Sequence, residues 1–157
     1  MQRGKLAAII LITGLVAGTL DILAAIFILA GGDAARVFRF IASGAFGKAA
    51  FDGGSEMIAL GVFFHYLIAF SWTVFYFLIY PRIAFFRRSR WLSAIVYGAV
   101  VWTVMNLFVV PSSQIGFRGV NLWNWIENWL ILIVCIAVPI TTSAQRFYRT
   151  ANNEGNS

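Results

Sequence analysis

The sequence predicts an all-α protein, a four-helix transmembrane bundle with an interfacial or re-entrant helix between spans one and two. Two observations support this. Hydrophobic residues make up 61% of the 157-residue chain and charged residues only 11%, with a mean hydropathy of +0.82, whereas soluble domains carry about 25% charged residues. The chain also contains four apolar stretches, each long enough to cross a hydrocarbon layer of about 30 Å as a helix.

The four stretches are predicted to form one polytopic membrane domain over residues 1–145. The first has a single charge, Asp21, and the second and third end before Pro81 and Pro111. The fourth contains Pro139, which we expect to kink the helix. A polar cytoplasmic tail is expected over 146–157. In chain order, the predicted spans cover residues 6–30, 56–80, 91–110 and 122–142.

The segment 31–55 is rich in glycine and differs from the spans in composition. Asp33 is a plausible N-cap for a short amphipathic helix. One face of that helix would be apolar (Val37, Phe38, Ile41, Ala45) and the other polar (Arg36, Arg39, Ser43). An interfacial helix and a re-entrant loop both fit this pattern, because small residues permit tight turns near the membrane.

Basic residues flank the apolar stretches unequally, and this asymmetry predicts the orientation. With the N-terminus inside, eight cations lie on the cytoplasmic side: Arg3, Lys5, Arg82, Arg87, Arg88, Arg90, Arg146 and Arg149. Four lie on the opposite side: Arg36, Arg39, Lys48 and Arg118. We therefore expect both termini in the cytoplasm and the lipid bilayer as the main partner. The net charge of +6 is explained by this flanking pattern, so nucleic-acid binding is not expected.

A stripe of small residues on the first span is predicted to pack closely against another helix, since it includes a GxxxG pattern. Its members are Gly14, Ala17, Gly18, Asp21, Ala24 and Ala25. The opposite side is expected to face lipid and carries Leu15, Ile22, Leu23 and Ile26. Asp21 thus lies on the packed face, where a carboxylate needs protein or water around it.

The second span carries a matching stripe of Gly61, His65, Ala69, Trp72 and Tyr76. Antiparallel neighbours would place His65 at the depth of Asp21, within direct or one-water hydrogen-bonding reach. Asn106 and Glu127 continue a predicted polar cluster toward the outer surface. Trp72, Trp102, Thr103 and Asn124 are candidate lining residues, with Asn128 beside them. Arg39 or Lys48 is a candidate outer cap.

Three interpretations of the pair Asp21 and His65 remain open. It can be a structural lock between helices, or part of a proton, cation or polar-ligand pathway. A metal site is the third, although no HxxxH or ExxH spacing supports it. The chain has one histidine and one cysteine and shows no cofactor motif or catalytic template, so we expect no cofactor and favour a non-enzymatic function.

Several motifs resemble those of small four-span bacterial inner-membrane proteins, and more distantly the YagU-like family. They are GLVAGTLDILAA (14–25), FIASGAFGKAAFDGG (40–54), GVFFHYLIAF (61–70), YPRI and YGAVVWTVMNLFVVP (97–111). The resemblance covers about residues 6–140. It implies a bacterial inner-membrane location and four-helix topology, with importance but no assigned activity for Asp21, His65 and Asn106.

Two function classes follow. One is a small transporter, channel or proton-linked membrane module that uses Asp21 and His65. The other is an accessory or assembly subunit of a membrane complex in which the pair is structural. Four helices enclose little volume, so transport would require a homo-oligomer or a larger complex.

Overall fold

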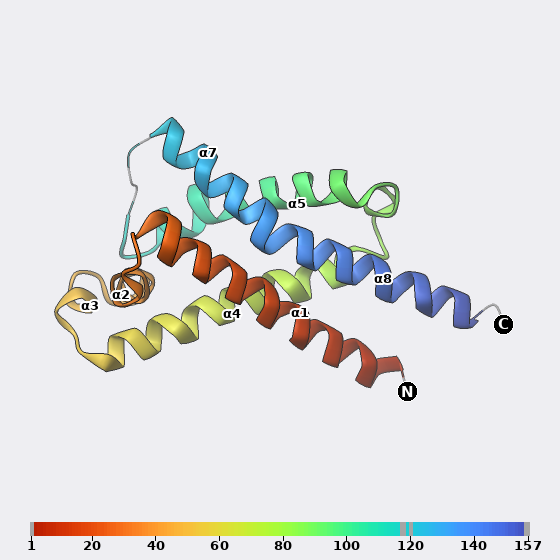
Figure 1. Ribbon diagram of the computed structural model, residues 1–157, viewed down its shortest axis with the longest axis horizontal. Coiled ribbons are helices and arrows are strands. Elements are labelled where there is room, and N and C mark those ends of the chain that lie inside the picture. Colours follow the sequence, from red (N-terminus) through yellow and green to blue (C-terminus); the bar gives the residue numbers. More distant parts are fainter. Residues whose placement is uncertain (1, 117–118, 120, 156–157) are drawn as a thin grey trace.

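The computed structural model describes residues 2–116, 119 and 121–155, with only the backbone described at 2–3 and 152–155. Arg118 and the side chain of Arg3, both counted in the predicted orientation, lie outside this description. Long helices run side by side along the molecule (Figure 1). Four are long and apolar enough to cross a membrane, and the described residues contain no strand. The predicted all-α bundle is confirmed.

The spans comprise Gly4–Leu29, Ser55–Ile79, Arg90–Ser112 and Leu122–Ala151. Only the second is a single α-helix, because the other three each contain a π-helical segment. The first joins α1 (Gln2–Ala24) to η1 (Ala25–Leu29), and the second is α4 (Ser55–Ile79). The third joins α5 (Arg90–Val104), η3 (Met105–Val109) and α6 (Val110–Ser112). The fourth joins α7 (Leu122–Ile131), η4 (Leu132–Ala137) and α8 (Val138–Gly155).

Helix α8 continues to Gly155, past residue 145 where the predicted membrane domain ends, so the polar segment begins as a helix. Its aromatic side chains explain the continuation. The Tyr148 hydroxyl donates to the Phe77 carbonyl over 2.8 Å, and its ring stacks on Tyr80 with a centroid distance of 5.1 Å. Packing against α4 thus stabilises a stretch whose own composition is polar. The third span likewise extends past Pro111 to Ser112.

Helix α1 lies between α4 and the fourth span, so two of its sides are covered. Ile22 and Ile26 are 5% and 8% exposed, which makes their predicted lipid-facing position wrong. Leu15 and Leu23 are exposed as predicted. The second partner explains the difference, because a helix with two neighbours buries more than one stripe.

The segment after the first span forms α2 (Ala34–Phe46) and the short α3 (Ala49–Asp52). Gly31 and Gly32 adopt φ of +62° and +97°, which allows the chain to turn sharply. As predicted, Asp33 caps α2, and its carboxylate accepts from the Arg36 backbone N–H over 2.9 Å. Figure 1 views α2 almost along its axis, so this helix crosses the end of the bundle in the manner of an interfacial helix.

The packed face of α2 is rotated from the predicted one. Ala42 and Ser43 are buried and Ala45 is exposed. Helix α2 crosses α4 where Gly61 lies against the backbone of Phe38, and Ala45 lies beyond this crossing in the last turn of α2. The Ser43 hydroxyl is satisfied locally by donating to the Phe40 carbonyl over 2.6 Å.

An aromatic core fills the half of the bundle that carries both termini. The rings of Tyr76 and Tyr97 lie 4.5 Å apart, and Phe77, Tyr80 and Phe86 extend the cluster. The short 3-10 helix η2 (Ala84–Arg87) is joined to its neighbours by two side chains, since the Phe86 carbonyl accepts from Ser93 and Gln145.

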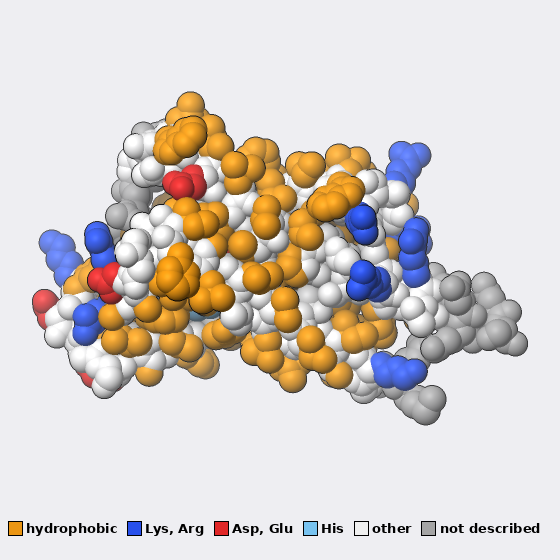
Figure 2. All heavy atoms as spheres, viewed as in Figure 1, with side chains coloured by type: hydrophobic (Ala, Val, Ile, Leu, Met, Phe, Trp, Pro, Cys, Tyr) orange, Lys and Arg blue, Asp and Glu red, His pale blue; other side chains and the backbone are white. Residues whose placement is uncertain are grey.

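Charge is distributed unequally between the two ends of the molecule. Figure 2 shows apolar side chains along the visible face, basic side chains at the end with the termini, and acidic and basic ones together at the opposite end. Among the described side chains, basic residues near the termini and in the connection between α4 and α5 are Lys5, Arg82, Arg87, Arg88, Arg90, Arg146 and Arg149, whereas Arg36, Arg39 and Lys48 belong to the segment of α2 and α3.

Candidate functional site

His65 is 8% exposed and lies on the face of α4 that packs against α1. Its Nε2 atom is 2.7 Å from the Gly18 carbonyl oxygen. A carbonyl can only accept, so Nε2 carries the proton in this hydrogen bond and Nδ1 is the ring nitrogen left for a second interaction. A Cβ at Gly18 would lie 3.1 Å from Ala69 and Tyr66, so the absence of a side chain permits this close helix contact.

Asp21 lies one turn beyond Gly18 on the same helix and is partly buried. It interacts electrostatically with His65 on α4 and with Cys135 in η4. Within the described residues its carboxylate makes no hydrogen bond, and His65 bonds the Gly18 carbonyl instead. The two residues are therefore neighbours at one depth, but they are not joined directly.

Three π-helical segments lie in the same half of the bundle as these polar residues. A π turn spaces its hydrogen bonds five residues apart, is rare, and is frequent at functional sites. Segment η1 begins four residues after Asp21, η3 contains Asn106, and η4 contains Cys135. In three spans, the half that carries these polar residues therefore contains π-helical turns, whereas the half near the termini is α-helical.

Two of the three segments end two residues before a proline: η3 ends two residues before Pro111, and η4 two residues before Pro139. Proline lacks the N–H that an α-helix needs and clashes with the carbonyl four residues earlier. In the wider turn an N–H bonds the carbonyl five residues earlier instead of four, as the Val138 N–H does with the Ile133 carbonyl. Membrane helices tolerate proline through such adjustments. Pro111 and Pro139 therefore mark two of these segments in the sequence, although they predicted only a span end and a kink.

Asn106 joins the third span to the fourth. Its Nδ2 atom donates to the Trp102 carbonyl over 3.0 Å and to Asn128 Oδ1 over 3.4 Å. The ring of Trp102 packs edge-on against Trp125 with centroids 5.0 Å apart. The indole N–H groups of Trp102 and Trp129 are buried and have no partner in the described structure. These unpaired N–H groups can donate to a carbonyl, an anion or a water oxygen, and sequence reasoning did not predict them.

The remaining predicted residues take different positions. Glu127 is partly buried next to Asn128 on α7, Thr103 is partly buried on α5, and Asn124 is exposed. Trp72 lies two turns of α4 from His65, and its ring packs against Tyr97 in the aromatic core. It therefore lies away from the polar residues that it was predicted to line.

The two candidate outer caps lie away from Asp21. Arg39 interacts electrostatically with Glu56 at the start of α4, nine residues and about 13 Å before His65 along the helix. Its Nε atom is buried and has no hydrogen-bond partner in the described structure. Lys48 is exposed between α2 and α3. No group of three or more His, Cys, Asp and Glu side chains suited to a metal occurs among the described residues.

Comparisons with protein-family models, with curated proteins and with solved structures found no match to this chain. The resemblance to the YagU-like family therefore remains a prediction from the sequence motifs. The four apolar helices establish a multi-pass membrane protein, and a more specific function has to be inferred from the polar half of the bundle.

Proposed function

We propose that this integral membrane protein is a small proton-linked membrane module in which Asp21 takes up and releases a proton. One observation supports the proposal above the others: Asp21 lies inside a membrane span without a hydrogen-bond donor in the described structure, beside the only histidine of the chain. An acid in that position changes its charge by binding a proton, because an uncompensated carboxylate is costly within a membrane.

His65 is the proposed exchange partner. With Nε2–H donating to the Gly18 carbonyl, a proton that leaves the Asp21 carboxyl can bind Nδ1 of the neutral ring. This transfer yields a carboxylate and an imidazolium, and the reverse step restores both neutral groups. Asn106 and Asn128 are the proposed polar groups between this pair and the outer surface. Since four helices enclose little space, the route to water would run along an interface with a second copy or another subunit.

We expect Asp21→Asn to reduce proton flux to the level of protein-free vesicles, because the amide retains the shape but cannot release a proton near neutral pH. Flux is measured with a trapped pH-sensitive dye in proteoliposomes after a potassium diffusion potential is applied. Asp52→Asn is the matched control, because Asp52 is exposed on α3 outside the site and its variant should conduct like the wild type. Equal flux in the wild type and in Asp21→Asn contradicts the proposal.

A second candidate function is an accessory or assembly subunit of a membrane complex. The hydrogen bond between His65 and Gly18 favours it, because this bond fixes α1 against α4 without involving an ion. In this case affinity purification in mild detergent should recover a stoichiometric partner, and wild-type vesicles should not conduct protons. Purification of the wild type alone, together with flux that depends on Asp21, would exclude it.

We also infer a bacterial inner-membrane location with both termini in the cytoplasm. The resemblance of the sequence motifs supports the location. The concentration of basic residues around both termini and the connection between α4 and α5 supports the orientation.

A further inference from the structure

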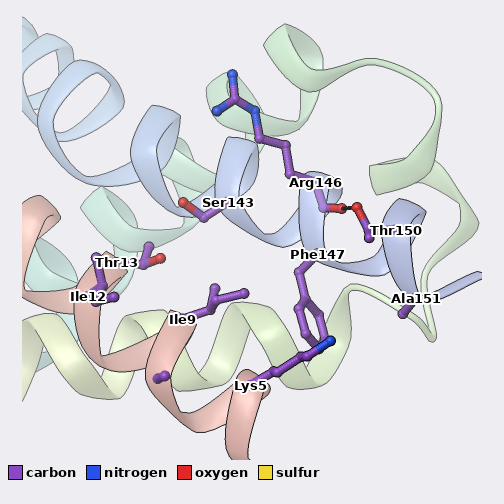
Figure 3. Close-up of a pocket in the computed structure, with 10 residues that line it drawn as sticks. Lys5, Ile9, Ile12, Thr13, Ser143, Arg146, Phe147, Thr150 and Ala151 are labelled. Carbon is purple, nitrogen blue, oxygen red and sulfur yellow. Dashed lines mark hydrogen bonds between the residues drawn. The ribbon is translucent and has the colours of Figure 1, made fainter. Parts of the chain in front are cut away.

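A groove of about 520 Å³ lies between α1 and α8 at the end of the bundle that carries the termini (Figure 3). Lys5 and Arg146 supply its two cations, Ile9 and Phe147 form much of its apolar wall, and Thr13 and Ser143 are the hydroxyl groups at greater depth. The volume is within the range of small-molecule sites, about 300–1,000 Å³. The groove is thus large enough for a substantial part of a ligand.

The chemistry of the groove changes along the membrane normal. Lys5 and Thr13 are eight residues apart, so the groove follows α1 for about 12 Å. The headgroup region of a bilayer is about 5–7 Å thick on each side. A groove that begins at Lys5 therefore crosses this region, passes the apolar side chains of Ile9 and Phe147, and reaches the hydroxyl groups of Thr13 and Ser143 at its deeper end.

Thr13 provides a second, independent indication of a ligand. It is 4% exposed, lines the groove, and makes no hydrogen bond in the described structure. By contrast, the hydroxyls of Thr73 and Thr150 donate to the carbonyl four residues earlier in their helices. A buried hydroxyl without an acceptor is unfavourable in an apolar medium. An ester carbonyl in the groove would satisfy it.

We propose that the groove between α1 and α8 binds one anionic phospholipid. Its phosphate lies between Lys5 and Arg146, an ester carbonyl accepts from Thr13, and the acyl chains continue past Thr13 toward the centre of the bilayer. The two cations come from helices at opposite ends of the chain, and Figure 3 shows them on different sides of the groove. Basic pockets between membrane helices are suited to anionic headgroups. Lipid binding would thereby hold α1 to α8, independently of Asp21.

The test measures binding of dioleoyl phosphatidylglycerol to the delipidated full-length protein in detergent, by native mass spectrometry and by thermal unfolding. Dioleoyl phosphatidylcholine has the same acyl chains and a neutral headgroup. We expect one phosphatidylglycerol per chain and a higher melting temperature than with phosphatidylcholine. The double variant Lys5→Gln/Arg146→Gln should bind it about thirtyfold more weakly, since each cation near an anionic headgroup contributes about fivefold in affinity.

Two controls separate the groove from general surface charge. Arg87→Gln/Arg88→Gln removes two cations at the same end but outside the groove and should bind like the wild type. Ala8→Trp fills the groove, keeps every charge, and should lose binding; circular dichroism checks that both variants are folded. Equal loss in the Arg87/Arg88 pair, or full binding by Lys5→Gln/Arg146→Gln or Ala8→Trp, would overturn the proposal. Inorganic phosphate that stabilises the protein as well as the lipid would overturn the assignment to a phospholipid.

Discussion

At the scale of single residues, several polar side chains of this protein bond backbone carbonyls, including His65, for which the sequence predicts a carboxylate partner. His65 bonds the Gly18 carbonyl, Asn106 bonds the Trp102 carbonyl, and Tyr148 bonds the Phe77 carbonyl. Within a membrane, a polar side chain is stabilised by a hydrogen bond to whichever acceptor lies within reach, so it need not bond one particular partner. The sequence identifies which polar side chains need partners, but it does not identify the carbonyl that each of them reaches.

The relation between Asp21 and His65 can be measured by a double-mutant cycle. We expect His65→Leu to lower the free energy of unfolding by about 0.6–1.7 kcal/mol, the range for hydrogen bonds between membrane helices. We also expect the effects of His65→Leu and Asp21→Asn to be non-additive by at least about 0.5 kcal/mol, because the two groups interact. Unfolding in mixed micelles, followed by tryptophan fluorescence, provides the four free energies.

Tyr66→Phe is the matched reference for this cycle. It removes the hydrogen bond of 2.8 Å between Tyr66 and Thr19 at the same helix contact but leaves both members of the pair intact. Its effect should add to that of Asp21→Asn within about 0.5 kcal/mol. If His65→Leu is equally additive, the two residues do not form an energetic pair.

At the scale of elements, close backbone contacts at glycine fix how the helices pack. A Cβ at Gly61 would lie 2.1 Å from the Phe38 carbonyl oxygen of α2. The sequence predicts Gly61 on the buried stripe of α4, whereas the identity of the helix that it meets depends on the path of the chain after residue 30.

We expect Gly61→Ala to destabilise the protein by about 1–3 kcal/mol, the usual effect of overpacking, since a backbone atom cannot move away cheaply. Gly44→Ala is the control: it lies within α2, and the nearest atoms to its added Cβ are 3.8 Å away, an ordinary contact. There the better helix propensity of alanine should stabilise the protein by up to about 1 kcal/mol. Thermal unfolding by circular dichroism distinguishes the two, and a neutral Gly61→Ala would contradict the close contact.

At the scale of the whole molecule, an aromatic core and a basic surface occupy one end, whereas the polar side chains and π segments occupy the other half. The aromatic half provides most of the buried apolar packing. The polar half holds Asp21, the residue proposed to take up and release a proton. The basic end also holds the lipid groove, so the two proposed sites can be altered separately.

The proposed orientation predicts the behaviour of reporter fusions. Green fluorescent protein attached after Ser157 should be fluorescent, and alkaline phosphatase at that point should be inactive, because both reporters would remain in the cytoplasm. Alkaline phosphatase inserted after Gly116, between the third and fourth spans, should be active. The reverse pattern would contradict the orientation, and it would place the lipid groove in the opposite leaflet.

The sequence by itself determined the number of spans, their approximate limits, the cap at Asp33 and the buried stripe through His65. These follow from hydropathy and helical periodicity, which depend on neighbouring residues along the chain. The tertiary structure alone decided that Ile22 is buried, that α8 continues beyond residue 145, and that His65 bonds Gly18. The physical reason is that each of these depends on a second helix brought alongside by distant parts of the chain, and no local pattern specifies that helix.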